Sequence, residues 1–236
     1  MHVVLTFDDA VSNHATAVAP LLRRHGFGAT FFICEYPGPG DGTDRFETDK
    51  HQYMTWGQIR GLAEAGFELG NHTGTHVVLR NRPDTVVSAE IALIESRFRE
   101  HGIPHPTAFA YPCGEYDDVA LACVRRHGYR LARATGARPW CPTTDDPFAI
   151  PSFVITDADP TGVAQALDAT AAAIHATGLP HLAVLTFHGV PDYNHPWVTF
   201  SPDNFLATLD LLRSRRCTVT ALRDVATPAG PSAIRP

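Results

Sequence analysis

The sequence predicts an α/β fold, a distorted (β/α) barrel with seven or eight largely parallel strands. Short apolar runs alternate with amphipathic stretches over nearly the whole chain, which is the pattern of βαβ units. Four of the runs stop at side chains suited to metal binding or acid–base chemistry, and α/β barrels collect such residues at the carboxyl ends of their strands. A length of 236 residues is compatible with a barrel that fills one domain.

The strands are predicted where apolar and β-branched residues run together between turn signals. In chain order, these runs lie at 3–7, 29–33, 67–70, 107–111, 129–132, 153–155, 182–187 and 218–222. Each is separated from the next by a helical pattern or a long loop, so neighbouring strands can be parallel.

Helices are predicted at 15–25, 56–65, 84–101, 119–127, 163–176 and 203–215. Gly26 follows the first one as its C′ residue, and Thr55 precedes the second one as its N-cap. Asp84 is expected to cap the third helix, and Asp117 or Asp118 the fourth. Apolar side chains recur at helical spacing along the third helix.

Irregular stretches at 36–54, 136–149 and 189–202 are rich in Pro, Gly or aromatic residues and are expected to be loops. The last two indicate an imperfect barrel. We expect residues 1–236 to form a single domain with a core of about 3–222, and the tail at 225–236 to be frayed.

Composition excludes several classes of protein. The hydrophobic content of 44% suits a globular core, and a net charge of -6 gives no basic surface for nucleic acid. Five widely spaced cysteines without a Cys-x-x-Cys pair favour free thiols. No apolar run approaches the roughly 18 residues of a membrane span, and no leader pattern opens the chain. The expected location is cytoplasmic, with a trimmed leader left open.

Two adjacent carboxylates, Asp8 and Asp9, follow the first strand. Neighbouring strand residues face opposite sides, but a turn at the strand end can aim both side chains inward. Two carboxylates so close are costly to ionise without a cation. A solvated turn is the alternative interpretation of this pair.

His72 and His76 follow the third strand as a His-x-x-x-His pair. If the segment is helical, both imidazoles share one face and can meet one ion. Together with Asp9 they supply two nitrogens and one oxygen, a set typical of a catalytic site with open positions. Such donors suit a divalent metal, with zinc as the first choice and cobalt, nickel or iron as alternatives. His188, at the end of a strongly apolar strand, could donate a proton.

Four ordered motifs together resemble the polysaccharide deacetylase family, the NodB-homology group of carbohydrate esterases. They are Thr6-Phe7-Asp8-Asp9, His72-Thr73-Gly74-Thr75-His76, Tyr111-Pro112-Cys113-Gly114 and Leu185-Thr186-Phe187-His188. The resemblance covers roughly residues 3–222. It implies a distorted (β/α) barrel, a divalent metal and hydrolysis of an N-acetyl amide.

The resemblance also implies roles for individual residues. Asp9, His72 and His76 would hold the metal, Asp8 would be the general base, and His188 would protonate the departing amine. Three further residues would bind the substrate. Cys113 would offer its backbone N–H to the oxyanion, Leu185 would belong to the apolar wall around the acetyl methyl group, and Tyr111 would line the site.

The chain departs from the family pattern in three places. Ala110 occupies the position of an Arg that orients the base, and Arg133 is a candidate replacement, with an ordinary surface charge as the alternative. Asp157 or Asp159 is a candidate to orient His188. Cys113 replaces a usual aromatic residue, so the family pattern does not predict the shape of the substrate groove.

Loop aromatics could stack on a sugar ring or pack beneath their own loops; they are Trp140, Tyr193 and Trp197. Glu35 could face the pocket or be solvated.

The sequence therefore predicts a metal-dependent hydrolase that removes an N-acetyl group from an amino sugar or oligosaccharide. Two alternatives stay open. The same machinery could act on a small non-sugar amide such as a cyclic imide, or the chain could be an inactive carbohydrate-binding module on this fold. The expected partner is a small-molecule or oligosaccharide substrate.

Overall fold

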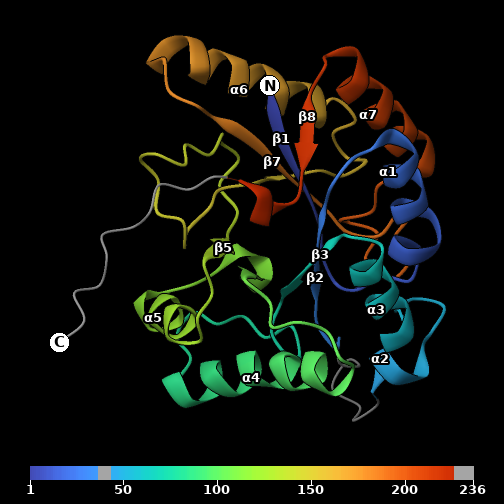
Figure 1. The fold of residues 1–236 in the computed structure, drawn as a ribbon, viewed down its shortest axis with the longest axis vertical. Helices are drawn as coiled ribbons and strands as arrows, with labels where there is room; N and C mark the ends of the chain where they lie inside the picture. The colour runs from blue at the N-terminus through green and yellow to red at the C-terminus, as the bar shows by residue number, and fades with distance from the viewer. Residues whose placement is uncertain (37–43, 226–236) are drawn as a thin grey trace.

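Eight parallel strands form the centre of the computed structural model, which describes residues 1–36 and 44–225 (Figure 1). They are β1 (His2–Phe7), β2 (Thr30–Ile33), β3 (Glu68–Asn71), β4 (Ala108–Ala110), β5 (Leu131–Arg133), β6 (Phe153–Val154), β7 (Leu182–Phe187) and β8 (Thr218–Thr220). Each lies within one or two residues of a predicted strand. The expected frayed tail after Val225 and part of the loop at 36–54 lie outside the described residues.

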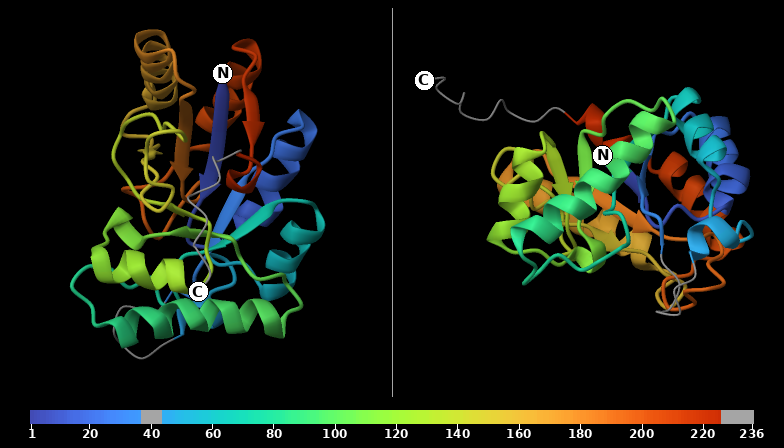
Figure 2. Two further views of the ribbon diagram at one scale, coloured as in Figure 1. Left: turned by 60° about the vertical axis from the view of Figure 1, so that its left-hand side comes forward. Right: turned by 90° about the horizontal axis from the view of Figure 1, so that it is seen from below.

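Helices surround these strands (Figures 1 and 2). The α-helices are α1 (Ala19–His25), α2 (Arg45–Thr48), α3 (Trp56–Glu64), α4 (Asp84–Glu100), α5 (Asp118–Arg126), α6 (Gly162–Thr177) and α7 (Pro202–Ser214). A π-helical turn η1 (His14–Val18) precedes α1, and 3₁₀ turns η2 (Pro112–Gly114) and η3 (Leu222–Asp224) follow β4 and β8. The short helix α2 lies inside the stretch predicted to be a loop.

The helix boundaries follow the capping chemistry of the sequence. Thr55 and Gln58 form a reciprocal capping box at the start of α3, and Asp117 accepts a hydrogen bond from Ala120 N at the start of α5. Gly26 ends α1 in the left-handed conformation that glycine adopts without steric cost. The prediction for α4 was wrong in one respect: its N-cap is Pro83, and Asp84 is the first helical residue. Asp84 still favours the helix there, because a negative charge in the first turn complements the helix dipole.

The strands pair in the order β5-β4-β3-β2-β1-β7-β6, with β8 beside β1. One edge of β1 is shared, because β8 pairs with its first half at 2–4 and β2 with its end at 6–7. Ile150 forms an isolated parallel β-bridge with Arg133 of β5. A few residues later in the chain, β6 pairs with β7. The segment between them therefore spans the gap between the two edge strands. This curled, incompletely regular sheet confirms the predicted distorted (β/α) barrel.

Both faces of the central strands are buried. Every residue of β7 is buried, as is every residue of β1 after His2, which explains why these strands are continuous apolar runs. The largest apolar cluster joins β1, β2 and β7 to the helices packed outside them. This packing fixes one rim, where the carboxyl ends of β1, β3, β4, β5 and β7 meet. None of the helices in the described ranges is long and apolar enough to cross a bilayer.

Candidate active site

A sharp turn at the end of β1 directs two neighbouring carboxylates into one cleft. Asp9 and Ala10 adopt φ angles of 70° and 50°, a left-handed conformation that is costly for residues other than glycine. Asp8 N–H still donates to the carbonyl of Phe187, which holds the turn against β7. Both Asp8 and Asp9 are 3% exposed. The turn predicted from the sequence is therefore present, and the solvated alternative is excluded by burial.

The His72–His76 segment is an irregular loop, so the helical interpretation of this pair was wrong. Thr73 and His76 have φ angles of 68° and 55°, which no α-helix contains. Glu90 on α4 accepts hydrogen bonds from the backbone N–H and hydroxyl of Thr75. The loop, rather than a helix face, brings the two imidazole rings to a centroid separation of 4.9 Å.

Asp9, His72 and His76 form a group with the geometry of metal ligands. The Oδ1 atom of Asp9 lies 3.6 Å from Nε2 of His72 and 3.4 Å from Nε2 of His76, and the three ligand atoms lie within 4.8 Å of one another. Tetrahedral zinc with bonds of about 2.0–2.1 Å separates its ligand atoms by roughly 3.3–3.4 Å. The residues present therefore fit a divalent ion with little movement.

The protonation states of His72 and Asp9 also suit a cation. Burial lowers the pKa of His72 to about 4, so its imidazole is neutral near pH 7. Its Nδ1 lies 2.8 Å from the carbonyl of Ala110, which leaves Nε2 directed at Asp9. Burial opposes ionisation of Asp9, but the imidazoles of His76, His188 and His72 together lower its pKa well below the usual value. The site therefore offers a neutral imidazole nitrogen and an ionised carboxylate oxygen to a single cation.

Asp8 has different surroundings from Asp9. Nη2 of Arg133 donates a 2.6 Å hydrogen bond to Oδ2 of Asp8. Arg133 is 1% exposed, so the alternative that it is an ordinary surface charge is excluded. Oδ1 of Asp8 is buried without a hydrogen-bond partner among the described residues.

His188 faces the same carboxylate from the end of β7. Its Nε2 lies 4.0 Å from Oδ2 of Asp8, and its carbonyl lies 3.0 Å from Nε2 of the buried His14. Within the described residues, neither of the two candidates proposed to orient His188 forms a hydrogen bond or an ion pair with its ring. Asp157 accepts hydrogen bonds from Ser201 and Asn204, and Asp159 accepts them from Thr161, so both serve to stabilise loops and helix starts.

The cleft has a volume of about 280 Å³, and two of the residues expected to bind the substrate, Tyr111 and Cys113, line it. Leu185 does not reach it. Leu185 lies in the apolar core, and the next residue, Thr186, lines the cleft instead. Because β7 is buried on both faces, its apolar pattern could not tell which side faces the barrel interior.

The loop aromatics divide into two kinds. Trp140 is fully buried in the core, which excludes it from stacking on a ligand. Trp197 is 69% exposed and lines the cleft, whereas Tyr193 is 81% exposed outside it. Glu35 forms an ion pair with Arg97 and accepts a hydrogen bond from Trp56 Nε1, so it does not face the cleft.

Among the residues near the site that were not predicted from the sequence are His14, Tyr36 and His195. With 13 histidines in the chain, an isolated histidine carries no signal of its own. The sequence feature that could have indicated His195 is its position in the loop after the candidate acid, four residues after Pro191.

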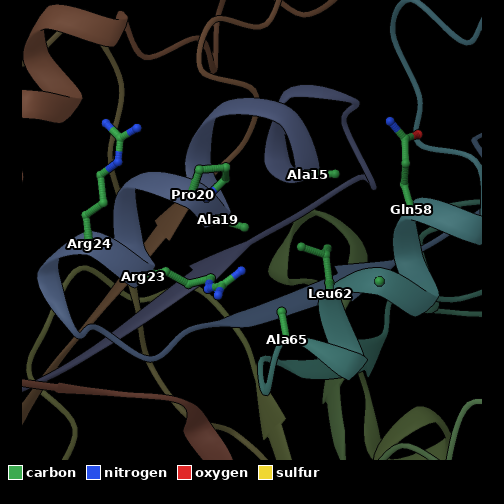
Figure 3. Close-up of a pocket in the computed structure, with 9 residues that line it drawn as sticks. Ala15, Ala19, Pro20, Arg23, Arg24, Gln58, Leu62 and Ala65 are labelled. Carbon is green, nitrogen blue, oxygen red and sulfur yellow. The ribbon is translucent and has the colours of Figure 1, made fainter.

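A second hollow lies between α1 and α3, away from this cleft (Figure 3). Small apolar residues and two arginines line it, and it contains none of the residues predicted for the site; the residues labelled in Figure 3 are Ala15, Ala19, Pro20, Arg23, Arg24, Gln58, Leu62 and Ala65.

Comparison with known proteins agrees with this architecture. The family profile described as polysaccharide deacetylase matches residues 1–132. A peptidoglycan-N-acetylglucosamine deacetylase of Bacillus cereus is 26% identical over 129 residues, which cover 54% of this chain and 54% of the relative. This chain spans about half the length of the curated relatives it matches. It belongs to the polysaccharide deacetylase family.

Solved structures share the fold. A family 4 acetyl xylan esterase from Clostridium thermocellum, in complex with a cobalt ion, has a TM-score of 0.64 and 21% identity, with 100% of this chain and 97% of that chain covered. A CE4 family pseudoenzyme from Bacillus anthracis has a TM-score of 0.64 and 14% identity, with coverage of 94% and 64%. At these identities the likeness establishes the barrel and not the activity.

Proposed function

We propose that this protein is a metal-dependent amide hydrolase that removes an N-acetyl group from an amino sugar or a short oligosaccharide. Membership of the polysaccharide deacetylase family supports the reaction class. The observation that carries the proposal is the contrast between adjacent carboxylates. Oδ1 of Asp9 lies at ligand spacing from Nε2 of both His72 and His76. Oδ2 of Asp8 also lies 3.7 Å from Nε2 of His72, but it is bonded by the guanidinium of Arg133 and faces the third imidazole, that of His188.

Asp9, His72 and His76 would hold the ion, and their donor set favours zinc over cobalt, nickel or iron. A divalent ion in such a site polarises a carbonyl and lowers the pKa of a coordinated water. The cobalt-bound neighbour supports a divalent ion on this fold without identifying the native one.

Asp8 would act as the general base toward the attacking water. Arg133 holds one carboxylate oxygen, Oδ2, and the other oxygen, Oδ1, has no partner among the described residues. The free oxygen can accept a proton while the held one keeps the carboxylate in place. Arg133 would therefore be a positioning residue that replaces the Arg expected two residues before Pro112.

His188 would be the general acid. When the acetyl carbon–nitrogen bond breaks, the departing nitrogen needs a proton, and the imidazole of His188 can donate it from the cleft wall. The contact between His14 and the His188 carbonyl would keep this residue at the strand end. The products are acetate and a free amine.

The test is acetate release from N-acetylglucosamine oligomers by the zinc-loaded protein. Asp8→Asn is the matched control, because it keeps the shape of the side chain but removes the base. We expect wild type to release acetate and Asp8→Asn to be slower by about 10²–10⁴-fold. Equal rates in the two proteins would exclude Asp8 as the base.

A small non-sugar amide is a second candidate substrate. The cleft volume of about 280 Å³ lies just below the roughly 300–1,000 Å³ usual for ligand sites. A cyclic imide belongs in the same assay for that reason. If neither substrate class reacts with metal-loaded wild type, an inactive carbohydrate-binding module becomes the favoured function, since a pseudoenzyme shares this fold.

A further inference from the structure

The loop after β7 holds a carboxylate–imidazole pair that the proposed chemistry does not use. The side chain of Asp192 is completely shielded from solvent, and its Oδ1 lies 3.4 Å from Nδ1 of His195. His195 lines the cleft, whereas Asp192 lies behind it. A shielded carboxylate beside an imidazole is expensive to build into a surface loop unless the imidazole is held for a purpose.

Asp192 is fixed by several donors. Nε2 of Gln52 donates to Asp192 Oδ1 at 2.9 Å, and so do the backbone N–H groups of His195 and Asn194, at 2.9 and 3.1 Å. The backbone N–H of Asp192 donates to Thr199. The carboxylate is therefore a rigid support whose position does not depend on the imidazole.

The support determines which edge of the His195 ring faces the cleft. Nδ1 is buried against Asp192, so Nε2, on the opposite side of the ring, is available to a ligand, and it has no hydrogen-bond partner within 1–36 and 44–225. The neighbouring carboxylate of Asp192 raises the pKa of His195. Burial opposes ionisation of Asp192, but its contact with His195 keeps its pKa below the usual value.

His195 lies one aromatic ring away from the metal-type residues. The ring of Tyr36 is 4.9 Å from the His195 ring and 4.9 Å from the His76 ring. Trp197 meets His195 edge-on at 5.4 Å. Because Tyr36 intervenes, His195 is outside the ligand group formed by Asp9, His72 and His76. A molecule with its acetamide at that group would extend along Tyr36 toward His195.

We propose that His195, held in place by Asp192, is a substrate-binding residue that forms a hydrogen bond with a ring hydroxyl of the substrate. This inference rests on the proposed function and narrows its substrate class to hydroxyl-bearing amides, as opposed to imides that lack hydroxyls. A hydroxyl suits this imidazole because it both donates and accepts hydrogen bonds. Tyr36 and Trp197 supply apolar surface for the face of the same ring.

The experiment compares two substrates that share the acetamide group. Methyl N-acetylglucosaminide carries ring hydroxyls, and N-acetylcyclohexylamine has none. In zinc-loaded protein we expect His195→Phe, which keeps a ring but loses both nitrogens, to lower the ratio of kcat/KM for the sugar to kcat/KM for the cyclohexyl amide by about ten-fold. The loss should lie in KM for the sugar. His195→Asn, which restores a donor and an acceptor, should recover part of it.

A ratio that stays unchanged in His195→Phe, or an equal fall on both substrates, would overturn the inference. Binding supplies a second test that does not require turnover. In an Asp8→Asn background, His195→Phe should raise the Kd of the sugar by about ten-fold and raise that of the cyclohexyl amide less. Equal Kd values for the sugar with and without His195→Phe would also overturn the inference. Absence of acetate release from wild type with this difference in Kd intact would contradict the proposed function alone.

Discussion

Arg133 and Asp8 are 125 residues apart in the chain and are joined by a 2.6 Å hydrogen bond from Nη2 to Oδ2. Their side chains are only 2% and 4% exposed. The pair exists because β5 and β1 end at the same rim of the barrel. A charge-assisted bond in a shielded position is strong, and it becomes costly if one partner is removed.

Replacing Arg133 should therefore harm both stability and activity. Arg133→Met leaves a buried carboxylate without its cation, and we expect the free energy of unfolding to fall by about 3–5 kcal/mol. Urea unfolding of the metal-free protein measures this loss. Arg138→Met is the matched control, because Arg138 pairs with Asp145 while 53% exposed, and its loss should cost no more than about 1 kcal/mol. Similar values for the two variants would contradict the importance of the buried pair.

Loss of the candidate acid should depend on the leaving group. His188→Asn cannot protonate a departing amine, so hydrolysis of an N-acetyl sugar should slow by about 10²–10⁴-fold. N-acetyl-4-nitroaniline releases 4-nitroaniline, a weakly basic amine that needs less protonation. His188→Asn should therefore slow the hydrolysis of this substrate much less. Rates of product release on both substrates give the comparison. A uniform loss would indicate that His188 serves binding or folding.

The stability of the metal-free protein should fall on mild acidification, in part because of His14. Burial lowers the pKa of His14 to about 4, compared with about 6.5 in an unfolded chain. Between these values the unfolded chain binds a proton that the folded protein does not, so stability decreases as pH falls from 6.5 and levels off near 4. The slope is about 1.4 kcal/mol per pH unit for one such group.

The His14 share can be isolated with a variant. From pH 7 to pH 5, the free energy of unfolding of wild type should fall by about 2 kcal/mol more than that of His14→Gln. Urea titration at the two pH values measures both changes. His175→Gln, on the exposed side of α6, should track wild type. If His14→Gln also tracks wild type, His14 is not held neutral in the folded state.

The sequence was sufficient to locate the strands along the chain and most helix starts. Helix starts could be located because capping residues such as Thr55 and Asp117 act locally. It was not sufficient for the conformation after β3. The left-handed φ angles at Thr73 and His76 are maintained by contacts with α4, among them the bonds from Thr75 to Glu90. Tertiary contacts of this kind leave no periodic pattern in the sequence.

Contacts between distant loops were also beyond the sequence. Arg133 could be named as a candidate because Ala110 leaves a position unfilled, but Gln52 and Asp192 carry no motif that would pair them. The mistaken wall residue Leu185 has a similar cause. The polar Thr186, which contacts Thr6 and Ser152 inside the barrel, was the better sign of the interior face.

The central claim is that Asp9, His72 and His76 meet at one cation while Asp8 does not hold it. Elemental analysis with zinc titration tests this on matched variants. We expect about one ion per chain in wild type and in Asp8→Asn. In Asp9→Asn and His72→Ala the affinity should fall by more than about 100-fold, since the loss of a mere supporting contact already costs 10–100-fold. Full zinc binding by Asp9→Asn, or its loss in Asp8→Asn alone, would contradict the account.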